Sequence, residues 1–341
     1  MDNITHSLVG ALAGQMGLKC KSGLAMPTLI LAANIPDVDA VAVLMGDNTH
    51  LAIRRGLTHG PLAMLVLPLV LWAAMISFDA WQLRRGKRPE QRLPLHKGWL
   101  LAMAYIGCAT HPAFDWLNSY GIRLLEPFSN EWFAGDSIFI IDIWILIIAG
   151  SGVWVSLRHE RLRKASWHRP AVTAFTVLCT YILANGWITG KAELEATQLV
   201  EQAYDLRPTE VVANPVPVRF WAREMLWRSD SKLGARYGSG NYSVFEGVNL
   251  LEIDENDSRR LKNITHANFD QADVGKLGEY GGFEVGIAKQ AAVQNKNVRA
   301  FLFWSRMPIL KTDGKFLVLT DQRFNNQLTR NAFKLELDVS H

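Results

Sequence analysis

Residues 61–83 read PLAMLVLPLVLWAAMISFDAWQL, and this run decides the fold class. A helix needs about 20 apolar residues to cross the hydrocarbon core of a bilayer, and Asp79 is the one charged residue in the run. Gly60 and Pro61 open it, and proline is well tolerated at the first position of a helix. The sequence therefore predicts a transmembrane helix that begins at this break.

Further apolar segments lie on both sides of this run. They are Ile4–Leu18, Leu24–Met45, Gly98–Leu117, Ile138–Leu157 and Pro170–Gly190. The first would be only about 22 Å long as a helix, and the second is interrupted by Asn34-Ile35-Pro36-Asp37-Val38-Asp39.

No secretory signal peptide is visible, because Asp2 opens the chain and no basic region precedes the first apolar stretch. We predict an all-α polytopic membrane domain of about six segments over residues 1–190.

The two parts of the chain differ in charge. Residues 1–190 hold 16 Lys/Arg and 12 Asp/Glu, whereas residues 191–341 hold 20 of each, so the net charge of +4 belongs to the first part. Most of that basic charge sits in two short loops, which argues against a nucleic-acid binder. The 12 Trp and 15 Phe provide surface to bury, which excludes a disordered chain. Three cysteines without a CxxC pair predict neither a disulfide framework nor a cysteine-bound zinc.

The second part, residues 191–341, reads as a small α+β soluble domain. We expect a charged helix over Lys191–Asp205, strands at Val211–Phe220, Tyr242–Leu251, Val298–Ser305 and Phe316–Leu319, and a helix over Ala272–Gln294. Thr312-Asp313-Gly314 is typical of a hairpin turn before the last strand.

Orientation in the membrane follows from the basic loops, because lysine and arginine resist translocation. One loop carries Arg84, Arg85, Lys87, Arg88, Arg92 and Lys97, and another carries Arg158, Arg161, Arg163, Lys164 and Arg169. Lys19 and Lys21 fit a third cytoplasmic turn, whereas residues 118–137 carry only Arg123. This pattern predicts an inner-membrane protein whose C-terminal domain lies on the periplasmic side.

Ionisable residues gather at the predicted outer ends of the segments. They are His6, Asp37, Asp39, His59, His111, Asp115, Asp136 and Asp142. Such groups are costly within a membrane, so each is a functional hypothesis. His111 and Asp115 are four residues apart and share one helix face. Three histidines with several carboxylates suit Zn²⁺, Mn²⁺ or Fe²⁺ better than Ca²⁺, as one ion or two.

Structural interpretations stand beside this one. Asp39, Asp136 and Asp142 suit helix N-caps or partners that orient the histidines as well as they suit metal ligation. Arg54 and Arg55 suit a clamp for a phosphate or a developing oxyanion, and they equally suit contacts with lipid headgroups.

Four motifs carry a family resemblance. They are Met1-Asp2-x-x-Thr5-His6, then Asn34-Ile35-Pro36-Asp37-Val38-Asp39, then Arg55-Gly56-x-Thr58-His59-Gly60, and then His111-Pro112-x-x-Asp115-x-x-Asn118-Ser119-Tyr120-Gly121. In order, spacing and identity this series resembles the YdjM-like family of bacterial inner-membrane, metal-dependent hydrolases over roughly residues 1–145. The segments around Asn214-Pro215-Val216-Pro217 and Asp321-Gln322-Arg323-Phe324 are similar to the appendage of longer members.

The resemblance implies a helical membrane domain with a His/Asp metal centre. It assigns the metal to His6, Asp37, His59, His111 and Asp115, with zinc as the expected ion. A looser likeness to zinc-dependent phospholipase C points to phosphodiester or lipid headgroup chemistry.

The leading hypothesis is a membrane-bound hydrolase in which the metal activates water for attack on a phosphodiester or ester. Asp39 or Asp136 would act as general base, and Arg55 would stabilise charge on the substrate oxygen. A site at the outer leaflet of the lipid bilayer favours an amphiphilic or phosphorylated substrate. The alternative is a non-enzymatic membrane protein, with a structural metal or a cation or proton pathway and an outer domain that binds a partner.

Overall fold

The computed structural model describes residues 1–45, 49–231, 234–251, 295–313, 316–324 and 333–337. The chain divides into two compact units. One comprises Met1–Val41 with Ile53–Gly186, and the other comprises Ala42–Ala52 with Trp187–His341. The first is helical and the second contains two β-sheets.

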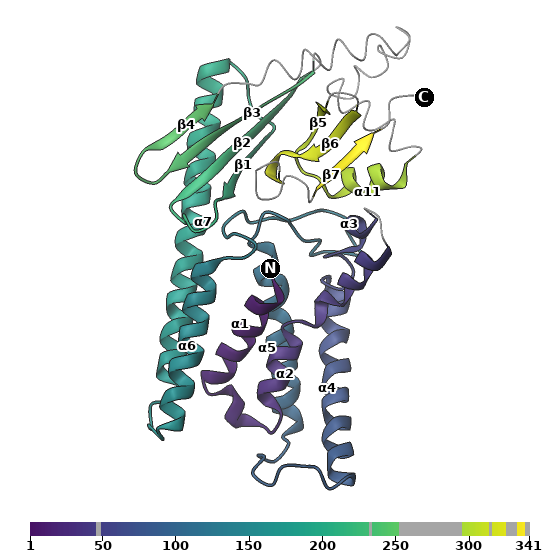
Figure 1. Ribbon diagram of the computed structural model, residues 1–341, viewed down its shortest axis with the longest axis vertical. Coiled ribbons are helices and arrows are strands. Elements are labelled where there is room, and N and C mark those ends of the chain that lie inside the picture. The colour runs from purple at the N-terminus through teal and green to yellow at the C-terminus, as the bar shows by residue number, and fades with distance from the viewer. Residues whose placement is uncertain (46–48, 232–233, 252–294, 314–315, 325–332, 338–341) are drawn as a thin grey trace. The chain divides into compact units, whose positions relative to one another are not determined.

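The helical unit follows the predicted apolar segments closely (Figure 1). Its helices are α1 (Asn3–Gln15), α2 (Ala25–Ala32), α4 (Pro61–Arg84), α5 (Lys97–Trp116), α6 (Ile143–Arg161) and the first part of α7 (Arg169–Tyr204), with 3₁₀ helices η1 (Leu18–Lys21) and η2 (Ile35–Met45). Short α3 (His50–Ile53) precedes α4 in the chain, and its first three residues, like the end of η2, are assigned to the second unit. Capping residues set two of the starts, because Asp2 accepts hydrogen bonds from the first turn of α1 and Asp142 does the same for α6.

The expectation of about six membrane-spanning segments is not supported. Among the described residues, two helices, α4 and α7, are long and apolar enough to span a membrane. A third span results if α2 and η2, which meet at a 45° bend, form one broken crossing. α1 has 13 residues, about 20 Å of helix, which is shorter than the bilayer core. In α5 the polar face that carries His111 and Asp115 is buried inside the unit.

Helix α2 packs between α1 and α5, and two glycines permit the close approach. A Cβ on Gly10 of α1 or on Gly107 of α5 would lie 2.7 Å from the carbonyl oxygen of Leu29 in α2. Leu29 is fully buried at this crossing. The close contact brings the C-terminal end of α2 against the last turns of α5.

The three basic loops of the helical unit lie at one end of it (Figure 1). Lys19 pairs with Glu160 at the end of α6, and the ammonium group also lies 4.6 Å from the ring of Trp167. The backbone of Gly23 donates to the carbonyl oxygen of Pro94 at 3.0 Å, which ties the α1–α2 turn to the α4–α5 loop. The basic loops are therefore neighbours in space, as they must be if they face the same side of a membrane.

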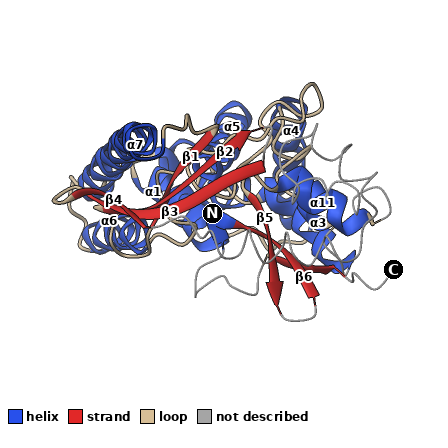
Figure 2. Ribbon diagram, turned by 90° about the horizontal axis from the view of Figure 1, so that it is seen from above, coloured by secondary structure: helices blue, strands red, loops and turns tan. Residues whose placement is uncertain are grey.

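The second unit contains two antiparallel sheets (Figure 2). The first has the order β1 (Glu210–Pro215), β2 (Ala222–Ser231), β3 (Gly234–Ser243) and β4 (Gly247–Leu251). Its core includes Ala192 and Ala196 of α7 packed with Ala213, Met225 and Tyr242. The second sheet has the order β5 (Pro308–Asp313), β6 (Phe316–Asp321) and β7 (Lys334–Leu337), and α11 (Lys296–Trp304) precedes it.

Several predictions for this unit are confirmed. The charged run Lys191–Asp205 is helical as the continuation of α7, so the last apolar segment and this run form a single 36-residue helix. The strand expected at Phe316–Leu319 is β6, and Asp313 pairs with Phe316 in the hairpin expected there. The strand expected at Val211–Phe220 is confirmed only up to Pro215, as β1, and the single strand expected at Tyr242–Leu251 is divided by a turn at residues 244–246 between the end of β3 and β4. The expected helix over residues 272–294 lies outside the described residues.

The expected strand at Val298–Ser305 is wrong, because this segment is the helix α11. Asn295 caps it by accepting a hydrogen bond from the backbone of Asn297 at 2.9 Å. Val298, Phe301 and Trp304 recur every three residues, and all three are buried. The helical period of these large side chains outweighs their preference for strands.

A buried ion pair lies where separate segments of this unit meet. Asp321 and Arg323 are fully buried, with guanidinium-to-carboxylate distances of 2.9 and 2.8 Å. The side-chain amide of Asn214 donates to the carbonyl oxygen of Arg323 at 2.9 Å. The two appendage segments noted in the sequence, around Asn214 and Asp321, thus meet in the structure.

Candidate metal centre

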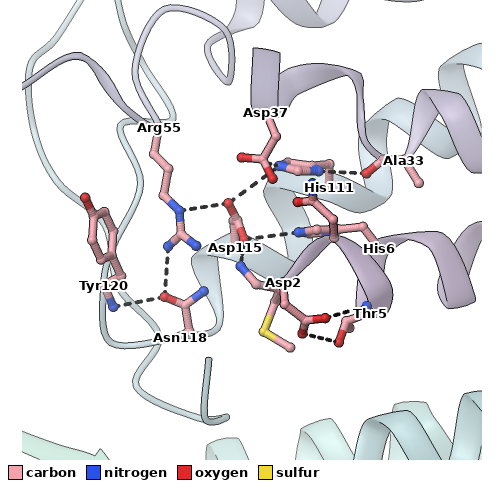
Figure 3. A network of polar contacts seen from close by, with 12 residues as sticks. Asp2, Thr5, His6, Ala33, Asp37, Arg55, His111, Asp115, Asn118 and Tyr120 are labelled. Carbon is pink, nitrogen blue, oxygen red and sulfur yellow. Dashed lines mark hydrogen bonds and ion pairs between the residues drawn. The ribbon is translucent and has the colours of Figure 1, made fainter. Parts of the chain in front are cut away.

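Two carboxylates and two imidazoles meet inside the helical unit. Figure 3 shows three of these four residues, Asp37, His111 and Asp115. Asp37, His59, His111 and Asp115 each offer one ligand atom, and these four atoms lie within 4.8 Å of one another. His59, His111 and Asp115 are buried and Asp37 is half-buried. They come from η2, from the loop before α4, and from α5, so segments distant in sequence form the group.

The spacing of the donor atoms suits a tetrahedral ion. Ligand atoms about 2.1 Å from such an ion lie about 3.4 Å from one another. The Nε2 atoms of His59 and His111 are 3.1 Å apart. Asp115 Oδ2 lies 3.6 Å from Nε2 of His111 and 3.7 Å from Nε2 of His59. Asp37 Oδ1 lies 3.7 Å from Nε2 of His111, and this buried oxygen has no hydrogen-bond partner. These residues fit a divalent metal.

His111 is oriented by the backbone of α2. Its Nδ1 atom lies 2.7 Å from the carbonyl oxygen of Ala33 (Figure 3). Because a carbonyl oxygen only accepts, Nδ1 carries the proton and the lone pair of Nε2 faces the other ligands. The carbonyl groups that end a helix lack partners within it, so the end of α2 leaves this oxygen available. The backbone thus fixes the tautomer that a metal requires.

His59 is oriented by Asp39 through Thr58. The Thr58 hydroxyl donates to Asp39 Oδ2 at 2.8 Å and lies 2.9 Å from Nδ1 of His59. Since the hydroxyl proton is given to Asp39, Thr58 accepts from Nδ1–H and leaves Nε2 to face His111. Burial lowers the pKa of His59, so its imidazole is neutral at pH 7, the form that binds metal. Asp39 therefore orients His59 through Thr58 and does not belong to the group of four candidate ligands.

Arg55 lies beside the carboxylates. Its Nε atom is 3.0 Å from Asp115 Oδ2, and its Nη1 atom donates to Asn118 Oδ1 at 3.0 Å (Figure 3). The guanidinium lies 4.6 Å from the ring of Tyr120, and the Arg55 backbone N–H donates to Asp39 Oδ2 at 2.7 Å. Arg55 has a positive φ of 54° and is buried, so the loop holds it in a strained conformation at the site.

His6 lies next to the group of four without belonging to it. Its ring stacks on that of His111 with centroids 3.8 Å apart, and its Nε2 atom is 3.4 Å from Asp115 Oδ1. The α-amino group of Met1 pairs with the same Asp115 oxygen. His6 Nε2 is buried without a hydrogen-bond partner, so it points at the shared carboxylate and remains a predicted ligand.

The other predicted acids lie outside this group. Asp136 is buried with a φ of 44°, and its neighbours Gly135 and Ser137 donate backbone hydrogen bonds to the carbonyl oxygens of Trp116 and Leu117. Asp142 is the N-cap of α6 and accepts a hydrogen bond from the hydroxyl of Tyr181 at 2.9 Å. Of the interpretations left open for Asp142, the helix cap matches the structure.

Some participants were missed in the sequence. Thr58 and Tyr120 belong to quoted motifs, yet nothing in their spacing assigned them to His59 or Arg55. Ala33 was also missed, because it acts through its carbonyl group alone. Arg54, which the sequence offered as a phosphate clamp or a lipid contact, lies 3.5 Å from Asp37 Oδ1. The interruption at residues 34–39 was the signal that a helix end, with unpaired backbone groups, lies near the acids.

The fold and this site define a class, namely a helical membrane protein with a buried His/Asp cluster that fits a metal. The family model of the YdjM inner membrane protein matches residues 1–192. The chain belongs to the YdjM inner membrane protein family, and the resemblance seen in the sequence is confirmed. The comparison with curated proteins returned no match, and neither did the comparison with solved structures.

Proposed function

We propose that this inner-membrane protein is a metal-dependent hydrolase that cleaves an ester or phosphodiester of an amphiphilic substrate at the outer leaflet. The observation that carries the proposal is the convergence of four donor atoms within 4.8 Å, two imidazole nitrogens and two carboxylate oxygens. This donor set suits Zn²⁺ best, with Mn²⁺ and Fe²⁺ also compatible. The four residues of this group provide enough ligands for one ion, and His6 lies beside the group.

Asp37, His59, His111 and Asp115 would hold a divalent metal, which would supply Lewis-acid chemistry for the activation of water toward phosphorus or a carbonyl carbon. The chain's own residues supply the rest. Arg55, beside Asp115, offers a fixed positive charge to an oxygen that becomes negative during the reaction. Asn118 and Tyr120 hold its guanidinium in place. The guanidinium is thus organised before substrate binds.

We assign different roles to the two acids predicted as general base. Asp39 Oδ2 already accepts from the Arg55 backbone and from Thr58, so Asp39 is a positioning residue for the loop and for His59. Asp136 takes the general base role. The segment around it is hydrogen-bonded to Trp116 and Leu117, which directly follow Asp115 in the chain.

Exposed apolar side chains on the segments that carry the site favour an amphiphilic substrate. In η2, Val38 and Val41 are 55% and 62% exposed near Asp37 and Asp39, and in the loop before α4 Leu57 is 56% exposed beside Thr58. Exposed apolar side chains around a polar centre are typical of a surface that meets lipid or a lipid-like ligand. A phospholipid or an isoprenoid-linked intermediate has this character.

The arrangement of the helical unit supports a site at the outer leaflet. The basic loops lie together at one end, and α5 starts at Lys97 in one of them. His111 and Asp115 lie in its last two turns, at the opposite end. If the basic end is cytoplasmic, the metal centre faces outward, and α7, which also starts at the basic end, delivers the C-terminal domain to the periplasmic side. We propose a multi-pass topology on this basis.

The experiment is metal analysis of the full-length protein purified in detergent. We expect about one zinc per chain in the wild type and in a His168→Ala control, and strongly reduced zinc in His59→Ala and His111→Ala. Equal metal content in all four proteins would overturn the proposal.

Hydrolysis is then measured with chromogenic phosphodiesters and esters and with fluorescent phospholipids. Asp136→Asn should keep its metal and lose about 10²- to 10⁴-fold in rate, as expected for a general base. If the wild type binds metal but turns over no substrate, and metal removal unfolds it, the structural-metal alternative replaces the enzyme.

A further inference from the structure

A groove runs between α6 and the start of α7, away from the metal centre. Its volume is about 540 Å³, within the range of small-ligand sites. Gly152 forms part of its lining, and a Cβ there would lie 2.3 Å from Cβ of Ala174, so the two helices touch at this point. The groove shares no residue with the group Asp37, His59, His111 and Asp115.

The lining of the groove is apolar along most of its length and polar at one end. Ile147, Val155 and Val177 provide apolar walls, and Ile147 and Val177 are about half exposed. His159, Ser166 and Arg169 lie at the end of the groove nearest the basic loop between α6 and α7. The groove therefore has apolar walls and, at the end near the basic loop, a polar and positively charged mouth.

The polar mouth holds donors that no described residue uses. Nδ1 of His159 is buried and has no hydrogen-bond partner. Arg169 is exposed, and no described acidic group forms an ion pair with its guanidinium. Arg163 and Lys164 add further positive charge to the loop between α6 and α7. An anionic group placed here would gain charge-assisted hydrogen bonds.

We propose that this groove binds an anionic glycerophospholipid of the inner leaflet, such as phosphatidylglycerol. The phosphate is bound by Arg169, His159 and Ser166, and an acyl chain lies along Ile147, Val155 and Val177. The positive charge of the mouth selects an anionic headgroup. The apolar walls, which come from α6 and from the candidate membrane-spanning helix α7, select a lipid over a free anion. Its position at the basic end places the headgroup at the cytoplasmic surface.

The test is native mass spectrometry of the detergent-solubilised full-length protein, titrated with phosphatidylglycerol, phosphatidylcholine or inorganic phosphate. We expect phosphatidylglycerol to bind at least about tenfold more tightly than phosphatidylcholine, and phosphate not to displace it at equal concentration. Equal affinity for the two lipids, or displacement by phosphate alone, would overturn the proposal.

Matched variants locate the site. Arg169→Gln should remove most of the headgroup preference, whereas Arg161→Gln, an exposed arginine outside the groove, should keep it. Thr173 lines the groove, so the larger side chain of Thr173→Trp should fill it and abolish tight lipid binding. Thr176 lies on the same helix outside the lining, so Thr176→Trp should leave lipid binding unchanged. Unchanged preference in Arg169→Gln contradicts the proposal, even where the tryptophan variants fail to fold. A stable dimer with the groove covered by a second copy also contradicts it.

Discussion

Asp39 supports the metal centre without belonging to the four-residue group. Its Oδ2 atom accepts from Thr58 and from the Arg55 backbone, and it lies 3.4 Å from Nδ1 of His59. Groups that orient a metal-ligating histidine in this way contribute to metal affinity although they make no bond to the ion.

We therefore predict graded effects of substitutions at the site. Asp39→Asn and Thr58→Val should weaken zinc binding by about 10- to 100-fold, because His59 loses its fixed orientation. Asp115→Asn should abolish binding. Zinc affinity is measured by competition with a chelator. If Asp39→Asn lowers affinity as much as Asp115→Asn does, Asp39 acts as a ligand and the assignment of a positioning role is wrong.

Asp321 makes the C-terminal unit sensitive to acid. Burial raises its pKa, but the Arg323 guanidinium and the Ser305 hydroxyl more than compensate and hold the pKa below its ordinary value of 3.8. Because the pKa is lowered by folding, the stability that the carboxylate contributes is present at neutral pH. It is lost as the pH falls through about 4 towards the lower folded value.

Asp321→Asn should destabilise this unit by about 3–5 kcal/mol at pH 7, since it leaves Arg323 buried without its counter-charge. The difference from the wild type should shrink below about pH 4, because the unfolded wild-type chain then binds a proton at Asp321 and the stability contributed by the folded carboxylate is lost. Hydrogen exchange of peptides over residues 296–324, corrected for intrinsic rates, measures this. Glu336→Gln, at an exposed acid on β7, is the control. A difference that stays constant from pH 7 to pH 3 would contradict the linkage.

At the scale of elements, the approach of α2 to α5 builds the site. Gly107 lies one turn before His111, and its contact with Leu29 and Ala32 sets the distance at which His111 meets the carbonyl of Ala33. No ligand is involved in this contact, yet the orientation of His111 depends on it.

Gly107→Leu should therefore reduce bound zinc although every metal ligand is retained. The added side chain overlaps the α2 backbone, and overpacking of this kind costs about 1–3 kcal/mol. Gly150→Leu is the control, because a Cβ at Gly150 meets nothing within 4 Å. Metal content and thermal unfolding are measured together. Full zinc occupancy in Gly107→Leu would show that the helix contact does not position the site.

The sequence predicted the helices better than the strands. Long apolar runs with clear start signals, such as Gly60-Pro61 before α4, placed each helix of the first unit. The pair His111 and Asp115 followed from helical spacing. The contacts of Ala33 and Thr58 could not be predicted, because they depend on how separate segments pack. The expectation of a strand at α11 is wrong because aromatic and β-branched residues favour strands, whereas the spacing of the buried side chains in this segment is helical.

At the scale of the whole molecule, membrane topology decides which side the metal centre faces. We expect reporter fusions at Arg92 and Lys164 to report the cytoplasm and a fusion at His341 to report the periplasm, since the basic loops resist translocation. Alkaline phosphatase and green fluorescent protein fusions measure this. A cytoplasmic reading at His341 would place the metal centre at the inner leaflet and exclude an outer-leaflet substrate.

The central claim is that Asp37, His59, His111 and Asp115 bind one metal ion. X-ray absorption at the zinc K-edge of the purified, zinc-loaded protein tests it most directly. We predict a first shell of nitrogen and oxygen at about 2.0–2.1 Å with imidazole scattering, and a measurable loss of that scattering in His111→Ala. A sulfur-containing shell, or a spectrum that is the same in wild type and His111→Ala, would contradict the claim.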